Sequence, residues 1–178
     1  MKTYKELLTL EMEKIGKDPA SIFVGQQVLF PGNPMSATLE KVNKNKIIEL
    51  PVMEETQMGV SLGLAMTGKK VVTFYPRWDF LISATNQLVN HVDKFKLMTG
   101  KDVKIICRIG KGADFPLDPG HQHKGNYLNE YKALCPNITF IDLQNPYDIE
   151  KSYEKAFNNA GIFCLIEYPE RYNDKVVS

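Results

Sequence analysis

The sequence predicts an α/β fold of three layers, in which a mostly parallel sheet of about six strands carries helices on both faces. Strand-like runs of apolar residues alternate with amphipathic, helix-like segments along almost the whole chain. The strand-like runs are largely apolar, as expected for strands that are buried on both sides. The chain has 178 residues and no internal repeat, which suits one domain with a sizeable core, so we expect residues 1–178 to form a single domain.

Six segments carry helix signals. The first opens on the capping box Thr3-x-x-Glu6, the third ends at Gly68, and the fourth is capped by Asp79. The fourth segment also has apolar residues at helical spacing, which are Leu81, Ala84, Leu88, Val92 and Phe95. The expected helices are residues 3–16, 36–42, 54–68, 79–100, 127–134 and 149–160.

The apolar runs between these helices predict the strands of the sheet. They are residues 21–24, 47–50, 70–75, 103–109, 138–143 and 162–168. In a parallel sheet, ligands bind beyond the carboxyl ends of the strands. Most of the unusual polar and aromatic residues stand in loops at those ends, which are residues 25–34, 51–54, 76–79 and 110–126. We therefore expect these four loops to converge on a binding site.

Charge and composition exclude several classes of function. The net charge is +1, with 22 basic and 21 acidic residues, so the chain has no electrostatic footprint for nucleic acid or an anionic membrane. No segment has the length and apolarity of a signal core or a bilayer span. Cys107 and Cys164 lie in strand-like runs, where cysteine acts as a small hydrophobe, and Cys135 is left without a pairing motif. A reduced, cytoplasmic location is therefore expected.

A carboxylate in residues 49–68 stands among unusual neighbours. Glu54 and Glu55 fall in the first turn of a helix, where such a pair can simply compensate the helix dipole. However, Pro51, Val52 and Met53 precede Glu54, and small residues follow it. The carboxyl group of Glu54 would then lie at the edge of a closely approached, largely apolar site, as an acid that relays a proton requires.

Several further motifs follow in order along the chain. Pro51-x-x-Glu54 opens the helix of small residues, and the later motifs are Asp79-Phe80, Gln87-x-x-Asn90, Lys94, Asn145-Pro146-Tyr147-Asp148 and Ile166-Glu167-Tyr168-Pro169. Together with the spacing of the helix glycines, they cover nearly the whole chain. This pattern resembles the pyrimidine-binding domain of thiamine-diphosphate enzymes. The resemblance is strongest to the beta subunit of 2-oxo-acid dehydrogenases, with transketolase a more distant relative.

The resemblance implies roles for the residues of two loops. Glu54 would hydrogen-bond a ring nitrogen of the cofactor's aminopyrimidine and favour the tautomer that activates the cofactor. Val52, Trp78 and Phe80 would contact the cofactor, although ordinary core packing explains aromatic residues equally well. Glu55 would point about 100° away from Glu54, toward solvent or a partner. Arg77 departs from the family pattern and is a candidate for binding an anionic substrate.

The loop of residues 110–126 contains His121 and His123. Either histidine is a catalytic candidate, because the resemblance places one loop histidine against the substrate carbonyl oxygen and histidine titrates near neutral pH. His121-Gln122 is similar to transketolases, whereas the distance to the next helix favours His123. A metal site with Asp114 and Asp118 is a weaker alternative, and solvated loop histidines are another.

Two features of the family are missing. The chain contains no Gly-Asp-Gly segment, which in the family holds the Mg²⁺ of the cofactor diphosphate, and no glycine-rich phosphate loop. It also stops where the carboxy-terminal domain of the beta subunit would begin, so we expect no such domain. The resemblance therefore implies thiamine diphosphate as cofactor and a separate diphosphate-binding subunit with Gly-Asp-Gly that holds Mg²⁺. A homodimer or a heterotetramer is expected.

These observations predict a subunit of an enzyme that decarboxylates or dehydrogenates a 2-oxo acid. Transketolase-like ketol transfer by a split enzyme is one alternative. A second alternative is a non-catalytic assembly partner that keeps the fold. A third, an unrelated nucleotide-binding α/β protein, is disfavoured by the missing phosphate loop.

Overall fold

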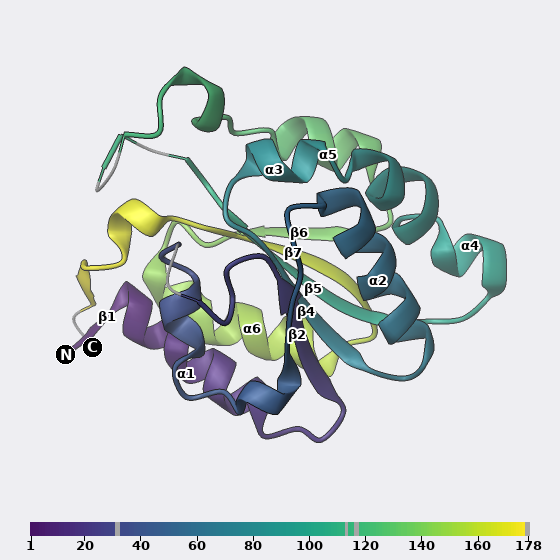
Figure 1. Cartoon of the computed structure of the whole chain (residues 1–178), viewed down its shortest axis with the longest axis horizontal. Coiled ribbons are helices and arrows are strands. Elements are labelled where there is room, and N and C mark those ends of the chain that lie inside the picture. Colours follow the sequence, from purple (N-terminus) through teal and green to yellow (C-terminus); the bar gives the residue numbers. More distant parts are fainter. Residues whose placement is uncertain (31–32, 113, 116–117, 177–178) are drawn as a thin grey trace.

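Six parallel strands form the central sheet of the molecule, in the order β3-β2-β4-β5-β7-β6 (Figure 1). The computed structural model describes residues 1–30, 33–112, 114–115 and 118–176. The strands are β2 (Ser21–Gly25), β3 (Ile47–Glu49), β4 (Lys70–Tyr75), β5 (Lys104–Gly110), β6 (Thr139–Asp142) and β7 (Gly161–Glu167). Each lies within about two residues of its prediction. The predicted parallel sheet is confirmed.

Helices cover both faces of this sheet (Figure 1). α1 and α6 pack against each other on one face, and α2 and α3 lie on the other with α4 and α5. The helices are α1 (Tyr4–Gly16), α2 (Glu54–Met66), α3 (Trp78–Ile82), α4 (Phe95–Thr99), α5 (Leu128–Leu134) and α6 (Ile149–Asn158). α1 opens on the predicted capping box, since Thr3 Oγ1 accepts from the Glu6 amide at 3.2 Å and Glu6 Oε2 accepts from the Thr3 amide at 2.7 Å.

The prediction of one continuous helix over residues 79–100 is wrong. This segment is divided into α3, a π-helical segment (Gln87–Val92) and α4, because the wider π turns interrupt the regular hydrogen-bond ladder. Asp79 is not the N-cap. That position belongs to Arg77, and Asp79 lies in the first turn, where its Oδ1 accepts from the Tyr127 hydroxyl at 3.4 Å. The predicted apolar face is nevertheless confirmed, because all five of its residues are buried.

The N- and C-terminal segments lie together, which the sequence did not predict. β1 (Lys2–Thr3) and β8 (Lys175–Val176) form a two-stranded antiparallel sheet. Strands of two residues are too short to carry a hydrophobic pattern, so only the folded chain reveals them.

A buried ion pair joins the carboxyl ends of β5 and β7. Arg108 and Glu167 are both fully buried, and Arg108 Nη2 donates to Glu167 Oε2 at 2.7 Å. Arg108 Nη1 also donates to Thr38 Oγ1 at 2.8 Å, while the hydroxyls of Tyr153 and Tyr172 donate to the carboxylate at 2.9 and 2.7 Å. Burial raises the pKa of both tyrosines well above the ordinary value, so they remain donors. Removing one partner of such a pair costs about 3–5 kcal/mol, so this network fixes the strand ends beside the loops.

Two further sequence predictions can be compared with the structure. Cys107, Cys135 and Cys164 are buried free thiols, and the first and last lie in β5 and β7 as predicted. Over the described part of the chain, no helix combines the length and the apolar character that crossing a membrane requires. The cytoplasmic location stays a prediction.

Candidate active site

A cavity of about 410 Å³ lies at the carboxyl ends of the strands, where the sequence predicted a site. All four predicted loops contribute residues to its wall, so they do converge. Residues 31–32, 113 and 116–117 of two of these loops lie outside the described residues. Four of the predicted site residues line the cavity, namely Val52, Glu54, Arg77 and Phe80.

Glu54 begins α2 at the edge of this cavity. Its side chain is half-buried, and its carboxylate has no hydrogen bond or ion pair within the described residues. The main chain here is anchored to β4, because the Tyr75 hydroxyl donates to the Glu54 carbonyl at 3.3 Å. Burial raises the pKa of Tyr75 well above the ordinary value, so the hydroxyl stays protonated. One turn further, Gln57 Nε2 donates to Thr73 Oγ1 at 2.9 Å and to the Phe74 carbonyl at 2.8 Å. The fold therefore positions a carboxyl group that is itself available to a ligand.

Glu55 has a different environment, although it is the next residue. It is exposed, as predicted, and its Oε1 accepts from Asn86 Nδ2 at 2.9 Å. Glu55 does not line the cavity.

The two candidate aromatic residues also differ in their positions. Phe80 lines the cavity, and its ring centroid lies 5.3 Å from that of His123, with the planes tilted by 59°. Trp78 is fully buried and stacks on Tyr131 at 5.3 Å, so it does not reach the cavity wall. A direct contact between Trp78 and the cofactor stays a prediction, and in this structure Trp78 supports α3 from within the core.

The two loop histidines are not equivalent. They lie in a 3₁₀ turn (His121–His123), in which His121 is exposed and His123 is half-buried. The Nδ1 atom of His123 is buried and has no hydrogen-bond partner within the described residues. Arg77 Nη1 donates to the His123 carbonyl at 3.2 Å. His123 thus contacts two residues of the cavity wall, whereas the exposed His121 has no hydrogen bond or ring contact with either of them among the described residues.

Close backbone packing brings the histidine turn to the cavity. Gly112 lies against the carbonyl of His123, and the space there would not admit a Cβ atom. Glycine is therefore needed at this position for the loop to return to the end of β5. Sequence reasoning dismissed this stretch because it does not form a phosphate loop, and so it missed both Gly112 and the neighbouring Lys111, which line the cavity.

The loop after β2 contributes two glutamines that sequence reasoning also missed. Gln26 and Gln27 line the cavity, and Gln27 has a φ of +52°, which is rare for a residue other than glycine. The carboxylate of Glu49 holds this turn by accepting from the amides of Gln27, Val28 and Leu29 at 2.5, 2.8 and 2.8 Å. The charge-assisted hydrogen bonds of Glu49 compensate the backbone strain at Gln27.

The alternative metal site at the histidine loop receives no support. The Lys124 ammonium pairs with Asp114 and, at 2.8 Å, with Asp118, so both carboxylates are engaged by a cation of the same loop. Where the chain is described, no three His, Cys, Asp or Glu side chains gather closely enough to hold a metal ion.

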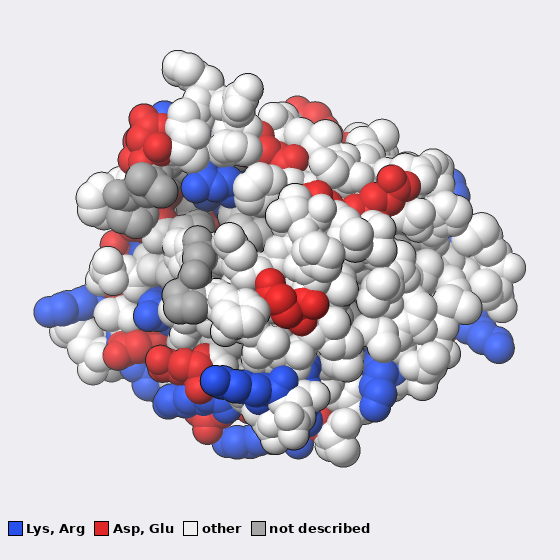
Figure 2. Space-filling model, viewed as in Figure 1, with Lys and Arg blue, Asp and Glu red and all other residues white. Residues whose placement is uncertain are grey.

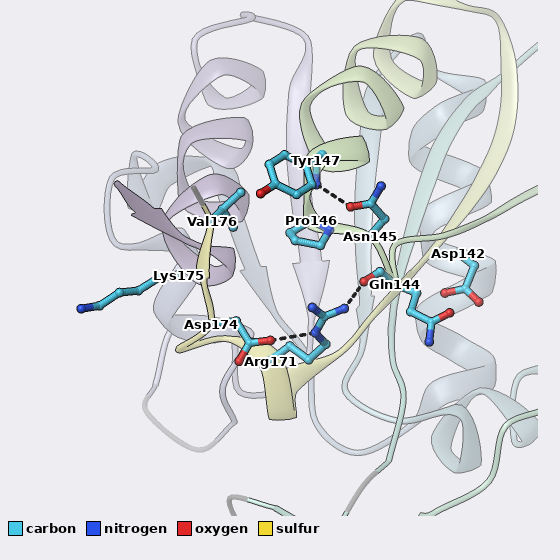
Figure 3. A pocket seen from close by; sticks show the side chains of 9 residues that line it. All are labelled: Asp142, Gln144, Asn145, Pro146, Tyr147, Arg171, Asp174, Lys175 and Val176. Carbon is cyan, nitrogen blue, oxygen red and sulfur yellow. Dashed lines mark hydrogen bonds and ion pairs between the residues drawn. The ribbon is translucent and has the colours of Figure 1, made fainter. Parts of the chain in front are cut away.

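A larger hollow of about 840 Å³ lies elsewhere, between the segment after β6 and the C-terminal segment (Figure 3). None of the predicted site residues lines it. Its arginine, Arg171, donates from Nε to Asp174 Oδ2 at 2.8 Å and also to the Gln144 carbonyl (Figure 3). We take the smaller cavity as the site, because it contains a free carboxylate and the neighbouring aromatic ring.

Comparison with known proteins identifies the family of the chain. Residues 1–173 match the family described as the transketolase pyrimidine-binding domain. The chain is 24% identical over 166 residues to the pyruvate dehydrogenase E1 component subunit beta of Chaetosphaeridium globosum, covering 90% of this chain and 50% of that protein. It is also 24% identical over 168 residues to the chloroplastic subunit beta-3 of Arabidopsis thaliana, covering 92% of this chain and 41% of that protein.

A solved structure supports the same fold. It is described as a split gene transketolase, inactive beta4 tetramer, and matches with a TM-score of 0.74 at 15% identity, covering 99% of this chain and 54% of that one. The chain therefore belongs to the family of transketolase pyrimidine-binding domains. It spans about half the length of the curated relatives that it matches.

Proposed function

We propose that this chain supplies the pyrimidine-binding part of a thiamine-diphosphate-dependent active site that acts on a 2-oxo acid. One observation carries the proposal: the free, half-buried carboxylate of Glu54 shares a cavity wall with Phe80 at the carboxyl ends of the strands. Because the chain belongs to this family, thiamine diphosphate is the cofactor that the residues of this site should fit.

The cavity residues fit the aminopyrimidine part of that cofactor. An aminopyrimidine has flat apolar faces and a polar edge, so Phe80 and Val52 suit its faces and Glu54 suits a ring nitrogen. When bound, thiamine diphosphate supplies a carbon nucleophile for a substrate carbonyl. Glu54 holds a proton between its carboxyl group and the ring nitrogen, and within the described residues this carboxylate forms no ion pair. The part of the chain that the structure describes holds no cluster of three His, Cys, Asp or Glu side chains for a metal ion, and the proposal assigns Mg²⁺ to the partner subunit, which would contain Gly-Asp-Gly.

His123 is the better placed of the two histidine candidates. Its ring contacts Phe80, and its buried Nδ1 is available to a bound group. We propose that His123 hydrogen-bonds the substrate carbonyl oxygen, as a general acid would, and that Arg77 contacts an anionic substrate. His121, which is exposed, is the second candidate.

The relatives favour a 2-oxo acid over a sugar substrate. The curated proteins are beta subunits of pyruvate dehydrogenase, and this supports decarboxylation or dehydrogenation. The solved relative is a split transketolase, which keeps ketol transfer as the second candidate. A non-catalytic assembly partner is a third, although it leaves the free Glu54 carboxylate without a role.

The relatives also support an assembly of subunits. We propose a partner subunit that contains Gly-Asp-Gly. This chain would form either a homodimer or, together with that partner, a heterotetramer. The solved relative is described as a tetramer of one chain type, which supports self-association of this domain. Apolar side chains on α2, α3 and α4 are exposed, including Met66, Ile82 and Leu97, and such residues favour burial at an interface.

The test compares two neighbouring glutamates. In the enzyme reconstituted with its partner, Glu54→Gln should lower turnover of a 2-oxo acid by about 10²–10⁴-fold, because an amide cannot exchange the proton. Glu55→Gln should retain most of the activity, since Glu55 is exposed and does not line the cavity. Circular dichroism of both variants checks that the fold is intact.

Equal effects of the two substitutions, or a larger effect at Glu55, would reject the assignment of Glu54. Activity of the wild-type enzyme with ketose phosphates but not with 2-oxo acids would select the second candidate function.

A further inference from the structure

Two basic side chains stand on the wall of the cavity. Arg77 follows β4 and Lys111 follows β5, and both line the cavity with Glu54. Among the residues that the structure describes, neither forms an ion pair with any carboxylate. The charged side chains of this wall are therefore two cations and one carboxylate.

The strand register explains why the two cations lie on the same wall. β4 and β5 are adjacent parallel strands, in which Tyr75 pairs with Ile109. Arg77 stands two residues after Tyr75, and Lys111 stands two residues after Ile109. Beyond the paired residues the chains stay close, because Gly110 lies against the carbonyl of Pro76 with no room for a Cβ atom. Both basic residues thus leave the same edge of the sheet at the same level.

The existing contacts of these side chains leave their charges uncompensated. Arg77 donates one hydrogen bond, to the neutral carbonyl of His123 at 3.2 Å, and a guanidinium has five N–H groups. The Lys111 ammonium lies 5.1 Å from the centroid of the Tyr168 ring. Both side chains are half-buried, so water screens their charges less than it would at the surface. An anion bound at this wall would compensate both charges.

The larger hollow provides a contrast within the same molecule. There Arg171 binds Asp174 and a main-chain carbonyl, so its charge already has a partner (Figure 3). Lys175 also lines the larger hollow, but its side chain extends away from the other lining residues (Figure 3), whereas Arg77 and Lys111 line the smaller cavity together with the carboxylate of Glu54.

We infer that Arg77 and Lys111 together form an anion subsite that binds a carboxylate or phosphate group of the substrate. The inference rests on the proposed function, in which Glu54 and Phe80 take the uncharged aminopyrimidine. The planar guanidinium of Arg77 can bind two oxygens of such a group, and Lys111 adds a point charge. Lys111 is then a specificity-determining residue. The diphosphate of the cofactor has the same chemistry and is the competing occupant.

The test uses the full chain and inorganic phosphate as the probe. Phosphate is titrated into the ¹⁵N-labelled protein, and the amide signals of Arg77 and Gly112 are followed by NMR. Lys111→Met and Arg77→Gln should each weaken binding about tenfold, as expected for the loss of one charge-assisted contact. Lys111→Arg should restore most of the affinity. Lys69→Met is the matched control, because Lys69 is exposed and far from the cavity wall, and it should bind like the wild type.

A second titration distinguishes the two occupants. Because the chain alone should bind thiamine diphosphate weakly, thiamine diphosphate and thiamine are each added with Mg²⁺ to the phosphate-bound enzyme reconstituted with its partner, and neither should displace the phosphate. Displacement by thiamine diphosphate but not by thiamine would assign the cations to the cofactor and overturn the inference. Wild-type affinity in Lys111→Met, or phosphate shifts confined to other residues, would overturn it as well. Neither titration measures turnover. A failure of the Glu54 test would therefore leave the result on phosphate binding by Arg77 and Lys111 unchanged.

Discussion

Neighbouring residues of like chemistry have different environments in this protein. Glu54 faces the cavity without a partner, whereas Glu55 is exposed and binds Asn86. A step of about 100° around the helix separates them, which is enough to move a carboxylate from a ligand cavity to the surface. His121 and His123 show the same separation within one short turn, where only His123 reaches Phe80.

This difference predicts unequal effects at the two histidines. In the reconstituted enzyme, His123→Ala should lower kcat by about 10²-fold, the size expected for a lost general acid, and should change cofactor affinity little. His121→Ala should have a small effect on both, because its side chain is exposed. Steady-state kinetics and a cofactor titration measure the two quantities. A larger effect at His121 would assign the general acid to His121 instead of His123. Small effects at both positions would show that both are solvated loop residues.

At the scale of elements, two neighbouring strands each begin with a lysine. Lys70 opens β4, Lys104 opens β5, and the two residues are paired in the register. Lys104 donates to the Ala156 carbonyl at 2.7 Å and lies 5.0 Å from the centroid of the Phe163 ring. Burial, and to a lesser degree the charge of Lys70, lowers the pKa of Lys104 from 10.5 to about 8.

The lowered pKa predicts a dependence of stability on pH. Between pH 8 and 10.5 the unfolded chain binds more protons at Lys104 than the folded chain does, so the free energy of unfolding rises with pH. Below pH 8 both states are protonated and the cost of burying the charge is fully present. Relative to Lys104→Met, the wild type should therefore gain stability across this window. The gain should be about 1 kcal/mol, because solvent screens a half-exposed ammonium.

Urea unfolding of both proteins at pH 7.5, 9 and 10.5 would measure this gain. Lys69→Met is the control, since Lys69 is exposed and its removal should leave the pH profile of the wild type unchanged. A constant difference between the wild type and Lys104→Met would show that burial does not perturb this lysine.

Charge is distributed unevenly over the whole molecule. In Figure 2, side chains of both signs crowd the lower edge, near α1, while the region of α2 and α3 shows separate acidic patches with uncharged surface between them. The same side of the sheet exposes Met66, Ile82, Leu97 and Met98. Uncharged surface with exposed apolar side chains is typical of a subunit interface.

The assembly prediction follows from this surface and from the family. The chain alone should bind thiamine diphosphate weakly or not at all in the presence of Mg²⁺, because the proposed Mg²⁺ ligands belong to the partner. Addition of a Gly-Asp-Gly subunit should produce tight binding and an assembly with two copies of each chain. Isothermal titration calorimetry and sedimentation of the mixture test both points. Tight one-to-one binding by this chain alone would reject the idea of a shared site.

The sequence by itself determined the class of fold, the elements of the sheet and the choice of Glu54. Apolar runs, the capping box at Thr3 and the order of the motifs are local properties, and they persist whatever the rest of the chain does. The tertiary structure decided what depends on distant residues. It divided the predicted long helix, packed Trp78 against Tyr131 in the core, and placed the ring of His123 against Phe80. It also placed Lys111 on the same cavity wall as Arg77, because residues 34 positions apart share a wall only when β4 and β5 pair in register. Pairing between strands is a long-range interaction, and no local pattern of sequence specifies which side chains it will place together.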